Sequence, residues 1–195
     1  DDKNKSIASK LSTSPSSENK REKNKSEGEV KEETEDECLV NFYKNVHCDV
    51  FGDQLLLLGS KDLVSKTRAR NHLFNVLGVR YVLNAANDVR GADGDTRFTI
   101  LRANAIDVEG YNIESIFKQS SNFIENAIDK EKVPIYVHCA EGVSRSVTIV
   151  LAYMILKRNM TLSASFDAIQ KVRWCAQPNI SFWQQLIKLD GRIHN

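Results

Sequence analysis

The sequence is poor in the residues that define several special architectures. Its 195 residues include only three prolines and nine glycines, which excludes a collagen-like or proline-rich chain. Four cysteines without a C-x-x-C pair exclude a dense disulfide scaffold. No run of about 18 apolar residues occurs, and the first apolar stretch begins near Gln54, so we expect neither a transmembrane helix nor a secretory signal peptide. These absences favour a reducing compartment, and we expect a cytoplasmic location with the nucleus as a second candidate.

Charge of either sign is not in excess. The 27 Lys and Arg residues nearly balance 26 Asp and Glu residues, which leaves a net charge of +1. Electrostatics therefore gives no reason to expect nucleic acid or a membrane surface as a partner. Hydrophobic residues make up 41% of the chain, a share typical of a globular domain diluted by a polar segment.

That polar segment is residues 1–37. It contains no aromatic residue and few apolar ones, so it has too little surface to bury for the ordering of its backbone to be offset. We predict that it is disordered and that residues 38–195 form one domain. The basic cluster at residues 19–25 is interrupted by Glu22 and is predicted to be a solvated linker, with a nuclear address or docking site as the alternative.

Strand and helix patterns alternate through residues 38–195. Short apolar runs predict strands, and apolar residues at helical spacing predict helices. Strands are expected at residues 55–58, 79–83, 98–101 and 135–138, and helices at 63–77, 111–129, 147–156, 162–174 and 181–192. This order predicts an α/β domain with a mainly parallel central sheet flanked by helices, ending in a C-terminal helical cluster.

The segment Val137-His-Cys-Ala-Glu-Gly-Val-Ser-Arg-Ser146 carries the chemistry. A predicted strand ends in Cys139, a loop with Gly142 follows, and Arg145 precedes a buried helix. Successive N–H groups of such a loop can point inward and form an anion-binding nest, at which the helix aims its positive end. These donors and Arg145 favour a thiolate on Cys139. Arg145 can hold two phosphoryl oxygens, and Ser146 can donate to the sulfur. A structural cysteine beside a surface arginine is the alternative, which this combined spacing disfavours.

The remaining histidines and cysteines suggest no metal site. His138 either organises the cysteine loop by hydrogen bonding or is an ordinary buried histidine. Cys38, His47, Cys48 and His72 form no recognised zinc pattern. We therefore expect neither a metal nor another cofactor.

The segment His138-Cys-Ala-Glu-Gly-Val-Ser-Arg-Ser146 resembles the HCxxGxSRS signature of the dual-specificity branch of the cysteine-dependent protein tyrosine phosphatases. The resemblance extends over residues 46–192, through Leu-Leu-Gly-Ser at 57–60, Gly-Val-Arg-Tyr-Val-Leu-Asn at 78–84, and Pro-Asn followed by Gln-Leu within 178–186. It implies the small single-domain phosphatase fold. It also implies hydrolysis of phosphotyrosine and of phosphoserine or phosphothreonine in phosphorylated proteins, through a phosphocysteine intermediate and without a cofactor.

The resemblance also implies roles for individual residues. Asp107 lies 32 residues before Cys139, on the loop where this branch carries its general acid, with Glu109 as the second candidate. Asp88 and Asp93 are less favoured because they precede the strand that delivers this loop. The expected catalytic residues are Cys139, Arg145, Asp107 and Ser146, and the expected substrate-binding residues are Ala140, Glu141, Gly142, Val143, Ser144 and Arg145.

One departure from the family pattern concerns the substrate. Many relatives carry paired arginines before the Pro-Asn motif, and one of the two can contact a second phosphate. Here Arg173 is followed by Trp174, which puts a preference for doubly phosphorylated substrates in doubt. Trp174 either lines the rim of the pocket, where it can stack on a phosphotyrosine ring, or is a core aromatic of the terminal helices.

Two other functions remain open at this stage. A catalytically weak phosphoprotein-binding module is one, although such proteins usually lose the cysteine, the arginine or the acid, and all three are present. A phosphatase acting on a non-protein phosphate ester is the other. Phosphoinositide phosphatases usually carry lysines in the signature loop, whereas Ala140, Glu141 and Val143 stand here.

Overall fold

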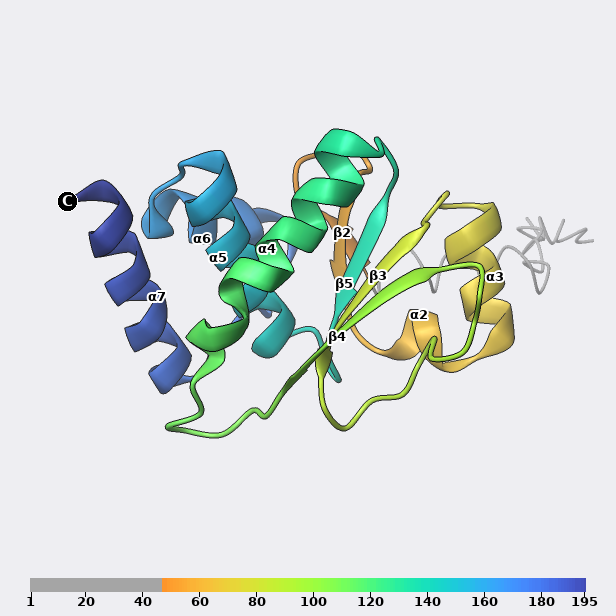
Figure 1. The fold of residues 1–195 in the computed structure, drawn as a ribbon, viewed down its shortest axis with the longest axis horizontal. Helices are drawn as coiled ribbons and strands as arrows, with labels where there is room; N and C mark the ends of the chain where they lie inside the picture. The colour runs from red at the N-terminus through yellow and green to blue at the C-terminus, as the bar shows by residue number, and fades with distance from the viewer. Residues whose placement is uncertain (1–46) are drawn as a thin grey trace, which may run out of the picture. The chain divides into compact units, whose positions relative to one another are not determined.

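The computed structural model describes residues 47–195, so the predictions for residues 1–37 and for the start of the domain lie outside the described residues. A five-stranded sheet with the order β1-β2-β5-β3-β4 lies at its centre (Figure 1). The β1–β2 pair is antiparallel, and the other three neighbouring pairs are parallel, which confirms the mainly parallel sheet. The strands are β1 (His47–Asp49), β2 (Leu56–Gly59), β3 (Tyr81–Ala86), β4 (Thr99–Ala105) and β5 (Ile135–His138).

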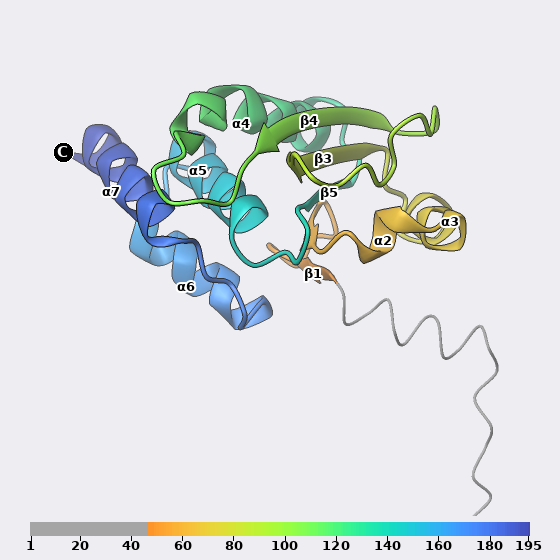
Figure 2. The same ribbon diagram turned by 90° about the horizontal axis from the view of Figure 1, so that it is seen from below.

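Helices cover both faces of this sheet, as Figure 2 shows most plainly. One face carries α2 (Asp62–Ser65) and α3 (Thr67–Asn75). The other face packs against α4 and α5, and α6 and α7 pack in turn on α5. The four helices on that side are α4 (Phe117–Glu125), α5 (Arg145–Arg158), α6 (Leu162–Val172) and α7 (Ile180–His194). The predicted fold class, with its C-terminal helical cluster, is confirmed.

Alternation along the central strands supplies two apolar cores. Leu56 and Leu58 of β2 belong to the core beneath α5, whereas Leu57 belongs to the core beneath α2 and α3. The same alternation places Val137 of β5 in the first core and Tyr136 in the second. Both faces of these strands are therefore covered, which explains why they read as continuous apolar runs rather than as alternating ones.

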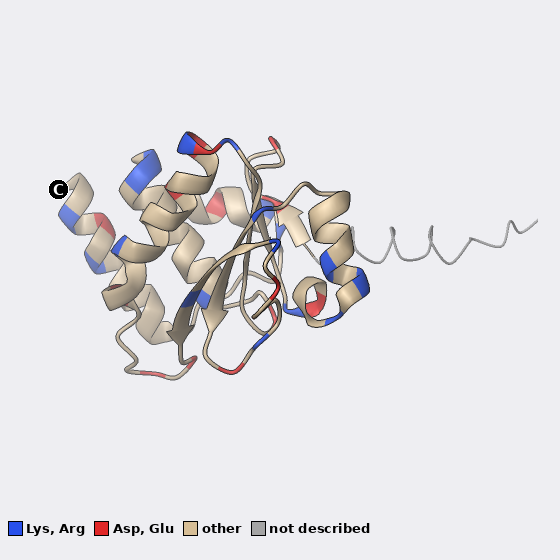
Figure 3. Ribbon diagram, turned by 45° about the vertical axis from the view of Figure 1, so that its right-hand side comes forward, with Lys and Arg blue, Asp and Glu red and all other residues tan. Residues whose placement is uncertain are grey.

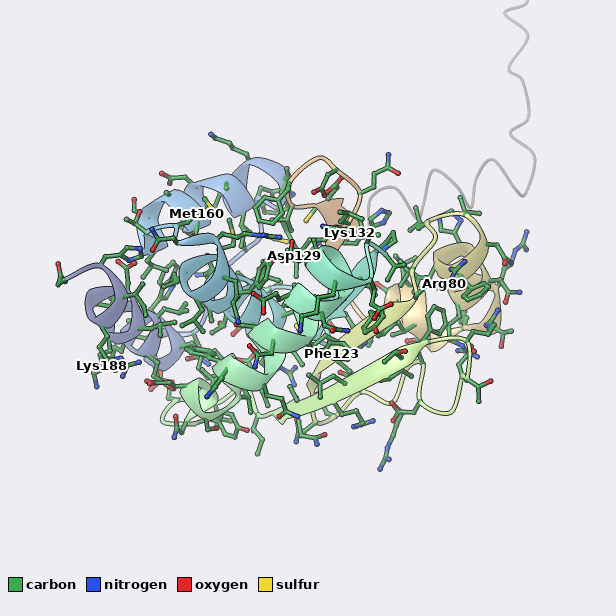
Figure 4. The ribbon with its side chains drawn as sticks, turned by 45° about the horizontal axis from the view of Figure 1, so that its top comes forward. Arg80, Phe123, Asp129, Lys132, Met160 and Lys188 are labelled. Carbon is green, nitrogen blue, oxygen red and sulfur yellow. The ribbon has the colours of Figure 1, made fainter. Side chains whose placement is uncertain are left out.

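The central helix α5 is buried almost all round. Every residue from Arg145 to Ile155 is buried, and the helix ends where Asn159 adopts the left-handed conformation with φ +51°. An ion pair of 3.0 Å between Arg158 of α5 and Asp129, labelled in Figure 4, ties its C-terminal end to the π-helical turn η2 (Asn126–Lys130). The N-terminal end of α5, at Arg145, lies directly after the loop that follows β5.

Several predicted boundaries were wrong. The helix expected at residues 63–77 is two helices, because Lys66 between them is extended at φ −116° and ψ 146°. The helix expected at 111–129 consists of the 3-10 helix η1 (Ile113–Ile116), α4 and η2. The strand expected at 98–101 continues as β4 to Ala105, so the acid-bearing loop is shorter than predicted. β1 was not predicted, because three residues give no measurable alternation.

Charged residues of both signs are scattered over the helices and loops of the described domain (Figure 3). Within residues 47–195 no helix is long and apolar enough to span a bilayer.

Candidate active site

The predicted cysteine loop lies at the carboxyl end of β5, between that strand and the N-terminus of α5. The Cys139 side chain is buried. Its sulfur accepts a hydrogen bond from the Gly142 N–H at 3.2 Å and another from the Ser146 hydroxyl at 3.3 Å. Two donors directed at one sulfur are the arrangement that a negatively charged thiolate prefers. The structure therefore brings these three predicted residues together.

The carbonyl groups of residues 140–143 are all held from outside the loop. The backbone N–H of Lys61 donates to the first carbonyl at 3.0 Å, and that of Gln177 donates to the fourth at 2.8 Å. Arg173 donates to the two between them, at 3.0 Å through Nη2 and 2.5 Å through Nε. Because the C=O and N–H of a peptide unit point in opposite directions, these bonds turn the following N–H groups inward. They form the anion nest that the sequence predicted.

Gly142 is required at the turn of this loop. Its backbone has φ +68°, a conformation that side chains disfavour. A Cβ at this position would also collide with the Arg173 guanidinium and with the Gly59 carbonyl oxygen at the end of β2. The loop is thus packed tightly between β2 and Arg173.

Replacing Arg173 tests this bracing. Arg173→Met removes both donors to the loop, and a hydrogen bond from a charged group contributes about 1.5–3 kcal/mol. We expect kcat/KM for a small aryl phosphate to fall about 10–100-fold, and the dissociation constant of inorganic phosphate to rise with it. Arg173→Lys keeps the positive charge and one donor, so its kcat/KM should lie between those of the wild-type chain and Arg173→Met. A wild-type kcat/KM in Arg173→Met would show that the loop holds its shape without this residue.

Arg145 lies at the edge of the nest between two carboxylates. Its Nη1 donates to Asp88 Oδ1 at 2.6 Å and to the Ala105 carbonyl at 3.3 Å, and its Nε lies 3.4 Å from Asp107 Oδ2. The hydrogen bond from Arg145 holds the pKa of Asp88 below its usual range. Asp88 therefore stays ionised and is unsuited to proton donation. No sequence pattern predicted the contact between Arg145 and Asp88, which are 57 residues apart.

Asp107 lies beside the loop on the segment after β4. Its Oδ1 accepts hydrogen bonds from the Ser144 hydroxyl and from Asn179 Nδ2, both at 2.9 Å. Asn179 also caps α7, because its Oδ1 accepts from the Phe182 N–H at 3.0 Å. One side chain thus joins the start of α7 to the acid loop. The Pro-Asn motif signalled this position, but the contact with Asp107 was not predicted.

The other acid candidates lie away from this arrangement. Glu109 is exposed, and Asp93 forms an ion pair with Arg102. Of the four carboxylates considered, only Asp107 contacts both the loop and Arg145 while remaining partly open to solvent, with 30% of its side chain exposed.

His138 is buried and supports the loop from below. Its Nδ1–H donates to the Cys139 carbonyl at 3.1 Å, and its ring stacks on Tyr136 with centroids 5.6 Å apart. Burial lowers its pKa to about 4, so the ring is neutral near neutral pH. Of the two roles predicted for His138, the hydrogen-bonding one is the one that the geometry favours.

The low pKa of His138 predicts a loss of stability in acid. The unfolded chain takes up this proton near pH 6.5, whereas the folded chain takes it up only near 4. The stabilisation is therefore complete above about pH 6.5 and lost as the pH falls toward about 4. We expect the free energy of unfolding in urea to drop by about 2 kcal/mol between about pH 7.5 and about pH 5. In His138→Gln that drop should shrink, and an equal drop in both proteins would contradict the assignment.

Among residues 47–195, no three His, Cys, Asp or Glu side chains lie close enough together to hold a metal ion. The groups available to a phosphoryl group at the loop are the N–H groups of the nest, the Cys139 thiol, the Arg145 guanidinium and the Asp107 carboxylate.

A mainly parallel sheet whose central strand is followed directly by a cysteine, with the nest after it and an arginine as the first residue of the next helix, defines the cysteine-dependent phosphatase class. Residues 63–191 match the family model described as the dual specificity phosphatase catalytic domain. The chain belongs to that family, which confirms the resemblance seen in the sequence.

Named relatives agree with this assignment. The chain is 39% identical over 123 residues to dual specificity protein phosphatase PHS1 of Arabidopsis thaliana, covering 60% of this chain and 13% of that protein. It is 34% identical over 142 residues to mouse dual specificity protein phosphatase 26, covering 71% of this chain and 65% of that protein. The crystal structure of human DUSP28 shares the fold, with a TM-score of 0.68 at 23% identity over 76% of this chain and 95% of that one. This chain thus spans less than two thirds of the two named curated relatives.

Proposed function

We propose that this chain is a protein phosphatase that hydrolyses phosphotyrosine and phosphoserine or phosphothreonine through a phosphocysteine. The observation that carries the proposal is the pair of hydrogen bonds that the Cys139 sulfur accepts from the Gly142 N–H and the Ser146 hydroxyl, in a loop that ends at Arg145. Family membership supports a phosphorylated protein as the substrate.

The first step transfers the phosphoryl group to sulfur. The Cys139 thiolate attacks phosphorus, and the bond from phosphorus to the seryl, threonyl or tyrosyl oxygen breaks as Asp107 gives that oxygen a proton. The inward N–H groups of the loop stabilise the charge on the three non-reacting oxygens. The dephosphorylated side chain then leaves as a neutral hydroxyl.

The second step releases phosphate. Water attacks phosphorus and Asp107, now ionised, accepts its proton, while the S–P bond breaks and the thiolate is restored. The Ser146 hydroxyl, 3.3 Å from the Cys139 sulfur, donates to the departing thiolate and lowers the barrier to this step.

Arg145 changes partners when the substrate binds. In the structure it contacts the carboxylates of Asp88 and Asp107. A phosphoryl group in the nest presents two oxygens to the planar guanidinium fork, which binds them bidentately. Release from Arg145 then frees the Asp107 carboxylate to take up and deliver the proton.

Asp107→Asn tests the proposed acid. With an aryl ester whose leaving group has a high pKa, we expect kcat to fall about 10²–10³-fold, because the leaving oxygen departs without a proton. The effect should shrink as the leaving group becomes more acidic, and the basic limb of the kcat–pH profile should flatten. Glu109→Gln is the matched control and should keep both the wild-type kcat and the basic limb of the kcat–pH profile. If Glu109→Gln destroys the rate and the basic limb while Asp107→Asn keeps them, the acid is Glu109.

A further inference from the structure

An apolar pocket lies beside the signature loop. It has a volume of about 430 Å³ and opens between the loop, α6 and the start of α7. No Asp, Glu, Lys, Arg or His side chain lines it. The lining residues that matter here are Val143 of the loop, Phe166 of α6, Trp174 and Gln177 of the connecting segment, and Trp183 of α7.

Trp174 is the most unusual part of this pocket. Its side chain is 88% exposed, so the prediction that it is a core aromatic was wrong. The alternative, that it lines the rim of the phosphate pocket, stays a prediction. Phe166 and Trp183, on the same lining, pack edge to face with centroids 4.7 Å apart and an interplanar angle of 84°. An aromatic pair and an exposed indole in one pocket give an apolar side chain a preformed surface to cover.

The pocket is continuous with the candidate active site. Val143 lies in the loop itself, and its carbonyl accepts a hydrogen bond from the Gln177 N–H at 2.8 Å. Val143 is therefore shared by the pocket wall and the loop that forms the anion nest. A substrate chain whose phosphorylated side chain occupies the nest advances about 3.3 Å with each residue. A neighbouring residue of the same substrate chain can reach the pocket after a short step past Val143.

The charges around the pocket disfavour a second phosphate as its occupant. Arg173, the basic residue next to Trp174, is not on the lining, and its Nε and Nη2 already donate to the carbonyls of Gly142 and Glu141. No cation lines the pocket, so a second phosphate would lose its hydration without gaining a charged partner. An uncharged apolar side chain has no polar group to desolvate on entering, and it covers the exposed indole.

We propose that this pocket is a substrate subsite for an aliphatic or aromatic side chain that lies a few residues from the phosphorylated one. The inference rests on the proposed function and makes it narrower: the preferred substrates are singly phosphorylated sites with an apolar neighbour. Trp174 is then the residue that determines this specificity.

A peptide scan tests the subsite. The host is a phosphotyrosine peptide with alanine at the neighbouring positions, and a single leucine is moved through about three positions on each side. For the wild-type chain we expect one position at which leucine raises kcat/KM about tenfold over the alanine host. Aspartate or a second phosphorylated residue at that position should give no gain.

Matched variants locate the effect. In Trp174→Ala the ratio of kcat/KM for the leucine peptide to that for the alanine peptide should fall to about one. Ile193→Ala removes another exposed apolar side chain, 43% exposed near the far end of α7, and should keep the tenfold ratio. The proposal is overturned if leucine gives no gain at any position, if the gain survives in Trp174→Ala, or if a second phosphate gives the larger gain.

A binding measurement separates this proposal from the proposed function. The Cys139→Ser chain should bind the leucine peptide about tenfold more tightly than the alanine peptide. Its tryptophan emission should move to shorter wavelength as the Trp174 indole leaves water. These results would support the subsite even if the wild-type chain hydrolysed nothing. If the wild-type chain hydrolyses a small aryl phosphate, and hydrolyses all of the peptides at the same rate as one another, the proposed function stands and the subsite is rejected.

Discussion

Cys139→Ser is expected to abolish hydrolysis while leaving phosphate binding intact. The hydroxyl that replaces the thiol remains protonated near neutral pH and is a poor nucleophile without an adjacent base. Turnover of a small aryl phosphate should fall by at least about 10⁴-fold. The inward N–H groups of residues 141–144 and the Arg145 guanidinium do not depend on the sulfur. Inorganic phosphate should therefore bind to the variant with a dissociation constant close to that of the wild-type chain.

Turnover and phosphate binding of Cys139→Ser, measured together, distinguish an error in the nucleophile from an error in the loop. Turnover by Cys139→Ser within about tenfold of the wild-type rate would show that phosphorus is attacked by another group, such as an activated water. Loss of phosphate binding together with turnover would show instead that the loop has collapsed, and it would remove the argument that the nest is held from outside by Lys61, Arg173 and Gln177.

Arg145→Lys is the second large effect. Lysine keeps the positive charge but presents a single ammonium group instead of a planar fork, so it cannot hold two phosphoryl oxygens side by side. It also cannot reach Asp88 and Asp107 together, as Arg145 does. We expect kcat/KM for aryl phosphates to fall about 10²–10³-fold, with phosphate binding weakened as well.

Arg158→Lys is the matched control for that variant. Arg158 is at the opposite end of α5 and pairs with Asp129 at 3.0 Å, away from the loop. Its replacement should leave kcat/KM within about twofold of the wild-type value. Near-normal kinetics in Arg145→Lys would contradict the role of Arg145 in holding the phosphoryl group.

The sequence predicted those parts of the site that are close together along the chain. Cys139, Gly142, Arg145 and Ser146 lie within eight consecutive residues, and one strand-loop-helix unit brings them together. Their spacing along the chain therefore determines most of their relative positions in the site. The strand at 135–138 was predicted to the residue and the one at 55–58 to within one, because strands covered on both faces read as apolar runs. The strand expected at 79–83 was less accurate, since β3 starts two residues later and ends three residues later.

The parts that sequence reasoning missed depend on tertiary packing. The contacts of Arg173 with the loop join residues 31 and 32 apart, and the contact of Asn179 with Asp107 joins residues 72 apart. No local pattern encodes which side of a loop a distant arginine approaches. The exposure of Trp174 was likewise undetermined, since an indole among apolar residues suits a core and a rim alike.

The most direct test of the central claim is detection of the phosphocysteine. The proposed role of the Ser146 hydroxyl in departure of the thiolate predicts that Ser146→Ala slows the second step more than the first and lets the intermediate accumulate. Acid quenching of Ser146→Ala during turnover of an aryl phosphate, followed by peptide mass spectrometry, should reveal a phosphoryl group on Cys139, with none there when Cys139→Ser is added. Turnover with no phosphoryl group on Cys139 at any quench time, or with the group on another side chain, would contradict the account.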